Sequence, residues 1–228
     1  MTVKMFGLIP PKPGMTSEEF HDYYRHPHGT IGQNMTTMRG YVQSHQIHTD
    51  LLGPGQKQYE AVAEVWLDNE NDILNFRDEP VLVKYLIEDE PKFVDMEKLT
   101  FLAASEEVIT SGPRINAGLH PGDEMWSLRT RPLSVKLLHF VLPDGNANWA
   151  QVGDAALGLK LGAFRHVRCR PLAMFHRDKP TFIGLHELWW PTRTAFHRAV
   201  AAEPKAFETL LAQAGKSVTL LAQAERFI

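Results

Sequence analysis

Histidine side chains offer most of the acid–base chemistry in this sequence. The chain of 228 residues contains eleven histidines, and His21, His26 and His28 lie close together near its N-terminus. An imidazole titrates near neutral pH, so a histidine that reaches a cavity is the usual general base of an enzyme without a cofactor. Histidines that lie beside an apolar face are therefore the first candidates for a catalytic site.

Helical spacing places two of these histidines beside one apolar stripe. Phe20 and Tyr24 lie on the same face of an expected helix, at about 100° per residue, and this face must pack against a sheet. His28 lies at the edge of the stripe with His21 beside it, although Pro27 makes the angle approximate. We interpret His28 as a candidate general base, Tyr24 as its catalytic partner and His21 as a substrate contact. The alternative is that His28 caps the C-terminal end of the helix, where an imidazolium interacts favourably with the dipole.

A second polar row lies on the strand expected over residues 40–48. Alternation puts Tyr41, Gln43 and His45 on one face of this strand. A row this polar suits a cavity wall with a few convergent polar groups, so His45 is a second candidate base and Tyr41 and Gln43 are candidate substrate contacts. The alternative is a hydrogen-bonded row inside the core.

The elements that position these residues follow the order β-α-β-β-α-β in residues 1–110. Strands are expected at 3–9, 40–48, 61–67 and 99–109. Thr16 and Glu19 form a capping box that starts a helix at Ser17, and a second helical segment over residues 69–85 is broken by Pro80. This order is that of a ferredoxin-like domain.

The same order recurs in residues 133–228. Strands are expected at 135–142, 164–172, 181–190 and 217–228, with helices at 147–159 and at 192–213, the latter interrupted by Pro204. Residues 111–132 hold several Gly and Pro residues without periodicity and are predicted to be a linker. The chain is therefore expected to be α+β, with two ferredoxin-like repeats whose bare antiparallel sheets pack face to face as one barrel-like core.

Three ordered matches support an internal duplication. The end of the first half, LAASEEVI at 102–109, matches LAQAERFI at 221–228, and Glu-Pro-Lys at 90–92 matches Glu-Pro-Lys at 203–205. The third match pairs Glu64 and Trp66 with Glu187 and Trp189. Because this pattern occurs in both halves, we expect these four residues to be structural, with Glu64 paired to a cation or to backbone amides.

Histidines also lie on the strands of the second half. His139, His166 and His186 are accompanied by alternating arginines that could bind a carboxylate. The alternative is a solvated strand edge, which commonly carries such charges.

Composition limits the class of protein. A formal net charge of −3 does not indicate the basic surface that nucleic-acid binding usually needs. No apolar run approaches the ~18 residues that a membrane span needs. The single cysteine, Cys169, excludes an internal disulfide and fits a reducing compartment. With no secretory signal pattern at the N-terminus, we expect a cytoplasmic protein without a membrane or nucleic-acid partner.

No metal and no cofactor are expected. His21, His26 and His28 lack the i, i+4 spacing of helix-borne zinc sites, and no carboxylate lies at a matching offset. The sequence also has no glycine-rich phosphate loop, which argues against a nucleotide cofactor.

The N-terminal half resembles the EthD family. The resemblance is carried by Lys12-Pro13-Gly14-Met15-Thr16, by Glu19-Phe20-His21-Asp22-Tyr23-Tyr24-Arg25, by His28-Gly29 and by the strand Gly40-Tyr41-Val42-Gln43-Ser44-His45. It spans about residues 3–109, whereas the second half lacks the helix signature. Tyr24 stands where the family commonly has tryptophan, so a stacking role for this ring is not transferred. The resemblance implies a dimeric α+β barrel, with a cavity between sheet and helices.

The resemblance also implies a small aromatic or polyketide-like ligand. Members of the family are linked to ether degradation, and their relatives act on aromatic polyketides as dehydratases, decarboxylases, cyclases or cofactor-free oxygenases. We therefore expect His28 or His45 to move a proton, Tyr24 or Tyr41 to hold an enolate oxygen, and Phe6 and Leu8 to supply an apolar floor for an acid or phenol. The alternatives are a non-catalytic small-molecule or stress-response module and a haem-handling protein, since related barrels can bind haem. A further association into a homodimer is left open.

Overall fold

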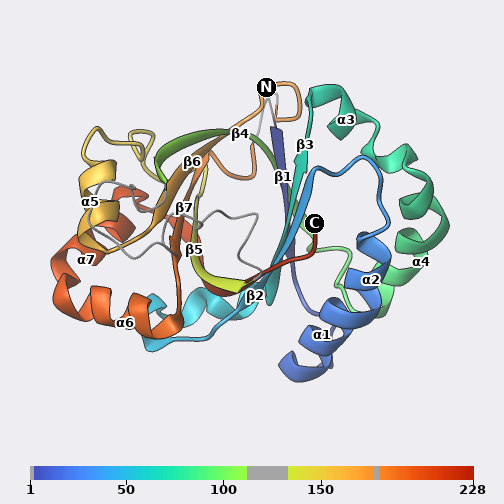
Figure 1. Ribbon diagram of the computed structural model, residues 1–228, viewed down its shortest axis with the longest axis horizontal. Helices are drawn as coiled ribbons and strands as arrows, with labels where there is room; N and C mark the ends of the chain where they lie inside the picture. The colour runs from blue at the N-terminus through green and yellow to red at the C-terminus, as the bar shows by residue number, and fades with distance from the viewer. Residues whose placement is uncertain (1–2, 112–132, 177–179) are drawn as a thin grey trace, which may run out of the picture.

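Eight antiparallel strands form a closed barrel with helices outside it (Figure 1). The computed structural model describes residues 3–111, 133–176 and 180–228. The strands are β1 (Val3–Ile9), β2 (Gly40–Gln46), β3 (Ala61–Leu67), β4 (Thr100–Ser111), β5 (Leu133–Val141), β6 (Arg165–Pro171), β7 (Gly184–Trp190) and β8 (Ser217–Arg226). The helices are α1 (Ser17–Tyr23), α2 (Gly29–Gly32), α3 (Glu70–Leu74), α4 (Ile87–Asp89), α5 (Asp154–Lys160), α6 (Arg193–Ala202) and α7 (Pro204–Gln213). Apart from Ser111, the predicted linker lies outside the described residues.

The order of strands around the barrel is β1-β3-β2-β8-β5-β7-β6-β4. The first half therefore contributes β4-β1-β3-β2 and the second contributes β8-β5-β7-β6. Two seams join the halves, because β2 pairs with β8 and β4 pairs with β6. The sequence predicted sheets whose faces meet, but it did not indicate these hydrogen-bonded seams. The seams remove open strand edges, which otherwise favour aggregation.

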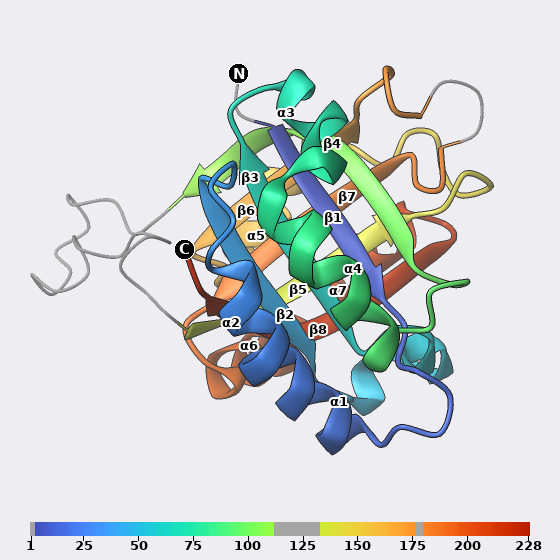
Figure 2. The ribbon, with the colours of Figure 1, turned by 90° about the vertical axis from the view of Figure 1, so that its right-hand side faces the viewer.

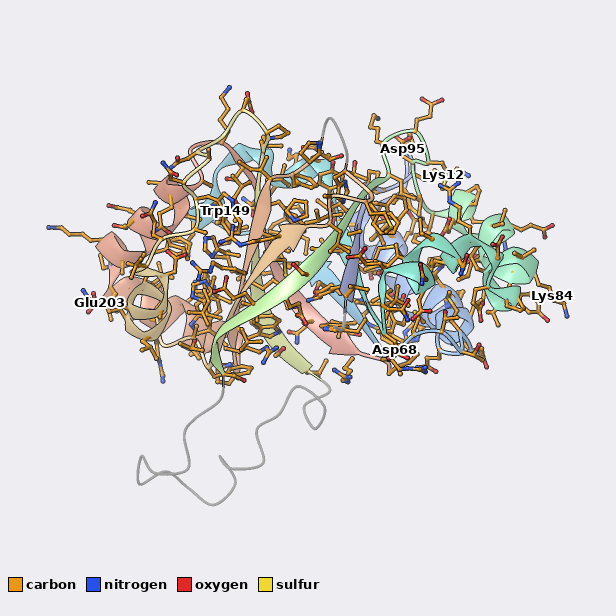
Figure 3. The ribbon with its side chains drawn as sticks, turned by 90° about the horizontal axis from the view of Figure 1, so that it is seen from above. Lys12, Asp68, Lys84, Asp95, Trp149 and Glu203 are labelled. Carbon is orange, nitrogen blue, oxygen red and sulfur yellow. The ribbon has the colours of Figure 1, made fainter. Side chains whose placement is uncertain are left out.

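The helices cover the outside of the barrel at two opposite ends. α1 to α4 lie over β1, β3 and β2 (Figure 2), and α5 to α7 lie over the second half (Figure 1). In the view from above, Lys12 and Lys84 mark the first end, and Trp149 and Glu203 mark the second (Figure 3). Within the described ranges, no helix combines the length and apolarity that a membrane crossing would need.

Alternation along the strands separates the barrel interior from the two helix-facing layers. Phe6 and Leu8 of β1 belong to the interior core, together with Leu138 and Phe140 of β5. Met5, which alternates with them, packs in the layer under the first-half helices. The choice of layer decides which side chains can meet a ligand under the helices.

The first helix begins as predicted but continues past its proline. The Thr16 side chain accepts from the Glu19 amide and the Glu19 carboxylate accepts from the Thr16 amide, so the capping box starts α1 at Ser17. Pro27 does not end the helix, because residues Tyr24–His28 form a wider π-helical turn that leads into α2. Such turns re-aim the side chains that they carry.

Two other helical segments are shorter than predicted. The segment over residues 69–85 is divided into α3, a 3-10 turn at Phe76–Asp78 and a further helical stretch that begins at Pro80 and contains the π-helical turn Leu82–Leu86. The helix expected at 147–159 begins at Asp154. Before it, the Asn146 side chain accepts from the Asn148 amide at 2.9 Å, an Asx turn that competes with helix formation.

Four buried charges lie at the centre of the barrel, and we call them the barrel quartet: Lys4, Glu64, Lys136 and Glu187. The Lys4 ammonium lies 2.8 Å from a Glu64 oxygen and 2.7 Å from a Glu187 oxygen. Lys136 contacts Glu64 and lies 3.2 Å from Glu187. Glu64, expected to pair with a cation, therefore pairs with two. Each cation neutralises carboxylates from both halves.

Tryptophan rings support both lysines. Lys4 is in register with Trp66, and its ammonium lies 4.1 Å from the Trp66 ring. Lys136 is in register with Trp189, at 4.2 Å from that ring. Burial acts to lower the pKa of Lys4, but the carboxylates of Glu187 and Glu64 outweigh it and raise the pKa above its ordinary value. Lys4 is therefore held as a cation inside the barrel, and both ammonium groups lie against aromatic faces.

Removing one charge of the barrel quartet should destabilise the protein strongly. Glu64→Gln leaves two buried lysines with one fewer carboxylate, and we expect the free energy of unfolding to fall by about 3 kcal/mol or more. Urea denaturation at pH 7 measures this change. The double variant Glu64→Gln/Lys136→Met restores the balance of charge and should recover part of the loss. A double variant with the summed loss of both single variants would contradict this account.

Candidate functional site

A pocket of about 80 Å³ lies between the first-half sheet and the helices over it. Its sheet side includes Met5, Gly7, Ala63 and Val65, and its helical side includes Leu82 and Leu86. The hollow follows from small side chains, because Gly7 and Ala63 lie directly opposite each other on β1 and β3. Three polar side chains complete this largely apolar lining, namely His28, Tyr41 and Glu90. An apolar pocket with a few convergent polar groups is typical of a small-molecule site.

His28 is held in the pocket wall by a buried carboxylate. Its Nδ1 donates to Asp89 Oδ2 at 3.0 Å, and the Tyr23 hydroxyl donates to the other carboxylate oxygen at 2.7 Å. The bond to Asp89 fixes the tautomer of the neutral ring, leaving Nε2 as the basic nitrogen. Burial acts to raise the pKa of Asp89, but the hydrogen bonds from His28 and Tyr23 outweigh it and hold the pKa at about 2.

Tyr41 offers a hydroxyl to the same pocket. The Gln43 amide donates to the Tyr41 oxygen at 2.8 Å and also to the Tyr24 carbonyl at 2.8 Å. Burial raises the pKa of Tyr41 to about 12, so the hydroxyl keeps its proton at neutral pH. Its O–H can therefore donate to an oxygen atom bound in the pocket. Gln43 acts by orienting Tyr41.

His45 and His21 form a network behind this wall. Their Nδ1 atoms lie 2.9 Å apart, and His45 Nε2 lies 3.1 Å from the Gln43 side-chain oxygen. His21 also faces Glu60, with 3.3 Å between Nε2 and a carboxylate oxygen. Burial, with Arg25 nearby, lowers the pKa of His45 to about 2. Both ring nitrogens of His45 are engaged and the ring stays neutral, so the geometry favours His28 over His45 as a base.

Tyr24 lies between the two histidines but does not line the pocket. Its ring centroid is 5.5 Å from that of His28 and 5.2 Å from that of His45. Burial first, and then the Tyr41 hydroxyl, raise the pKa of Tyr24 well above its ordinary value. In the described part of the chain, the Tyr24 hydroxyl makes no hydrogen bond of ordinary geometry. Of the two tyrosines, Tyr41 therefore lines the pocket, and Tyr24 packs against His28 behind it.

Phe6 and Leu8 lie on the side of the sheet away from the pocket, so they do not form the apolar pocket floor that was predicted. Both point into the barrel core, whereas the pocket opens on the opposite face of β1. Alternation along β1 explains the correction, because Met5 and Gly7 share the helix-facing side. Asp89 and Glu90 were not among the site residues predicted from the sequence. Glu90 was noted only as part of the Glu-Pro-Lys triplet at 90–92 that marked the repeat, and Asp89 directly precedes this triplet.

The second half carries larger side chains at the positions that match Gly7 and Ala63. His139 lies three residues after Lys136, just as Gly7 lies three residues after Lys4. On the neighbouring strand, His186 lies three residues before Trp189, just as Ala63 lies three residues before Trp66. His139 and His186 are directly opposite each other on β5 and β7. Imidazole rings therefore occupy the layer where the first half has Gly7 and Ala63.

The histidines of the second half are buried instead of lying on a solvated edge. His139, His166 and His186 are fully buried. His166 Nε2 lies 3.0 Å from His186 Nδ1, and His139 Nδ1 lies 2.6 Å from the Thr219 hydroxyl. Burial lowers the pKa of His139 and of His166 to about 3. These rings are neutral packing groups at neutral pH, and the predicted carboxylate site is not formed by them.

One group of potential metal ligands lies inside the barrel. The ligand atoms of Glu106, Cys169 and Glu187 all lie within 4.8 Å of one another. Lys4 already neutralises Glu187 at 2.7 Å, and burial raises the pKa of the Cys169 thiol well above its ordinary value. A thiol binds metal as the thiolate, so these residues are a poor fit to a metal ion. His21, His26 and His28 are not part of this group.

Comparison with known proteins agrees with this architecture. Residues 12–97 match the EthD domain family, so the first half carries an EthD domain. An anthrone oxidase-like protein has a TM-score of 0.60 at 12% identity, covering 99% of this chain and 93% of its own. A protein from Fusobacterium nucleatum, provisionally named a monooxygenase, has a TM-score of 0.54 at 8% identity, covering 100% and 92%. At these identities the likeness establishes a shared fold of the dimeric α+β-barrel type.

A third similar structure is provisionally named a chlorite dismutase. Its TM-score is 0.52 at 8% identity, covering 98% of this chain and 95% of its own. No curated protein sequence matches the chain. The likeness in fold thus extends through both halves, whereas the sequence match to a family covers residues 12–97.

The buried histidines should make the protein unstable in mild acid. Their pKa in the folded state is about 3 for His139 and His166 and about 2 for His45, whereas an unfolded histidine titrates near 6.5. The unfolded chain therefore binds more protons below pH 6.5, and stability present above that pH is lost as the pH falls. Each of these histidines should lower the free energy of unfolding by about 2 kcal/mol at pH 5. Urea denaturation at pH 7.5 and at pH 5 measures this change.

A pair of variants separates this effect from other titrations. His139→Gln removes one buried histidine, and the loss of stability between the two pH values should shrink by about 2 kcal/mol. His26→Gln changes an exposed histidine and should leave the loss as in the wild type. Equal losses in all three proteins would show that His139 does not contribute.

Proposed function

With an EthD domain in its first half, we propose that the chain is a small-molecule enzyme that moves a proton without a cofactor. The substrate is a small aromatic or polyketide-like molecule with a carbonyl group. It binds in the pocket between the first-half sheet and α2 and α4. The observation that carries this proposal is the His28–Asp89 pair, in which a buried carboxylate orients an imidazole at the wall of an apolar pocket.

The geometry supports proton abstraction next to a carbonyl. His28 Nε2 accepts the proton of the C–H bond, whose electron pair moves to form the carbon–carbon double bond of the enolate. Asp89 stabilises the imidazolium that results. The Tyr41 O–H, oriented by Gln43, donates to the enolate oxygen as negative charge develops there. An apolar lining strengthens these interactions because it lowers the local dielectric.

Several observations support an aromatic or similarly flat substrate. The enclosed volume of about 80 Å³ favours a small group in the inner part of the pocket. Phe101, which is 45% exposed, extends the lining toward solvent. A neighbour in structure is named anthrone oxidase-like, which agrees with this class but does not carry the argument. Dehydration, decarboxylation, cyclisation and oxygenation all begin with, or pass through, such a stabilised carbanion or enolate.

We also propose an internal duplication as the origin of the fold. An EthD-like repeat at 1–110 and a diverged repeat at 133–228 would each be ferredoxin-like, joined by a linker at 111–132. The matching strand orders and the matching Lys–Glu–Trp positions of the barrel quartet support this. On this account the second repeat lost its pocket when histidines occupied the positions of Gly7 and Ala63.

Exchange of carbon-bound protons tests the proposed function. Acetophenone is a small neutral aromatic ketone, and loss of its methyl signal in D₂O can be followed by proton NMR. The wild type should accelerate this exchange, and His28→Gln should lower the rate by roughly 10²-fold or more because the base is absent. His26→Gln, an exposed histidine two residues away, should retain the wild-type rate.

A third variant tests the place of the reaction. Ala63→Leu adds a larger side chain to the pocket floor, so the exchange should be lost while the urea midpoint changes little. Retention of full activity by His28→Gln would dismiss this residue as the base. Acetophenone binding without exchange in the wild type would favour the alternative of a non-catalytic binding module.

A further inference from the structure

Glu90 brings a second titratable group to the pocket, and its side chain has no partner. It follows Asp89 directly and lines the pocket together with His28 and Tyr41. In the described ranges, the Glu90 carboxyl group takes part in no hydrogen bond or ion pair of ordinary geometry, and the backbone carbonyl of Glu90 accepts from the amides of Phe93 and Val94.

Two fully buried carboxyl groups near this end of the molecule are satisfied. Asp89 accepts from His28 and Tyr23, and Glu79 accepts from the Val81 amide at 2.7 Å. Glu90 is half-buried at the pocket wall, where partial desolvation without a donor disfavours its charged form. The carboxyl group of Glu90 is therefore suited to a neutral form or to contact with a bound ligand.

The charged groups around Glu90 act in opposite directions. Burial raises its pKa, the neighbouring carboxylate of Asp89 raises it further, and His28 and Arg77 act to lower it. The net effect is a pKa above the ordinary value for glutamic acid. Tyr41, on the facing strand, stays protonated because its pKa is about 12.

We propose that Glu90 is a catalytic acid, which gives a proton to the substrate oxygen while His28 removes a proton from the adjacent carbon. This inference rests on the proposed function, because it needs His28 as the base of the same pocket. Glu90 supplies the proton that the substrate oxygen takes up, and its carboxyl group limits the class of substrate. The pair acts as a base and an acid on one bound ketone.

The proton transfer is balanced without an oxidant or reductant. The C–H bond breaks as His28 Nε2 takes the proton, and the electron pair forms the carbon–carbon double bond. The carbonyl oxygen takes the proton of Glu90, and the product is a neutral enol. An imidazolium and a carboxylate remain, and proton transfer between them through water restores the starting state.

The same residue selects neutral substrates. Neither lysine nor arginine is among the pocket-lining residues in the part of the chain that the structure describes. A carboxylate ligand would meet the oxygen atoms of Glu90 and would find no cation beyond His28. The expected aromatic acid is therefore disfavoured, and ketones and phenols without charge are the preferred class.

Exchange kinetics with acetophenone in D₂O test the role of Glu90. Glu90→Gln should lower the exchange rate by roughly 10- to 100-fold, because the amide cannot supply the proton. Glu88→Gln changes an exposed carboxylate on α4 and should retain the wild-type rate. Loss of rate in His28→Gln together with an unchanged rate in Glu90→Gln would overturn this inference and leave the proposed function intact. An unchanged rate in His28→Gln would overturn both.

Two further readouts separate an acid from a merely structural residue. Wild-type exchange should fall as the pH rises through the raised pKa of Glu90, since the protonated form is lost, and this limb should vanish in Glu90→Gln. Carbon-13 NMR of labelled glutamate side chains should show one carboxyl signal, absent in Glu90→Gln, that titrates above the ordinary range. A Glu90 signal with an ordinary pKa would contradict the inference.

A binding experiment tests the selection of neutral ligands. Benzoate should bind the wild type at pH 8 at least tenfold more weakly than acetophenone, and Glu90→Gln should reduce this difference. Fluorescence or chemical-shift titration measures both dissociation constants, with Glu88→Gln as the matched control. Equal affinity of the wild type for both probes would overturn the proposed selectivity.

Discussion

The barrel depends on four charges buried at its centre. Lys4 and Lys136 each bridge carboxylates from both halves, so displacing one half would break the two cross-half pairs, Lys4 with Glu187 and Lys136 with Glu64. Burying charge is costly unless every partner is present, and the cost disfavours arrangements in which the two sheets shift. The quartet therefore favours one placement of the two halves, in which β2 pairs with β8 in a defined register. That register brings the C-terminal Phe227 onto Tyr41, with ring centroids 5.5 Å apart, at the edge of the pocket wall.

The two helix-facing layers have the same geometry but different contents. Opposed small residues, Gly7 and Ala63, leave a hollow under the first-half helices. Opposed imidazoles, His139 and His186, occupy the equivalent layer of the second half. The side-chain size of one cross-strand pair thus distinguishes the two layers. Small residues leave a pocket in the first-half layer, and imidazole rings fill the same positions in the second-half layer. Helix widening at Pro27 and at the turn Leu82–Leu86 adds to this asymmetry, because both turns border the hollow.

Two adjacent carboxyl groups take different roles because their surroundings differ. Asp89 receives hydrogen bonds from His28 and Tyr23 and remains ionised, which suits it to orient and stabilise the imidazole. Glu90, with no such donors and with a pKa raised by burial, suits proton donation. Opposite shifts on neighbouring acids are a common way to place an acid and a base in one site.

The sequence alone determined the order of strands and helices, the start of α1 and the family of residues 12–97, because caps, alternation and a motif are local properties. Helical spacing and strand alternation also indicated His28 and the polar row of Tyr41, Gln43 and His45 as candidates for a site. Only the tertiary structure decided that the halves join through hydrogen-bonded seams, that Phe6 and Leu8 face the barrel, and that Tyr41 lines the pocket instead of Tyr24. It alone brought Asp89 to His28, across 61 residues of sequence. Strand alternation gives two faces but does not say which one the helices cover, and contacts between distant segments are set by packing, which no local pattern records.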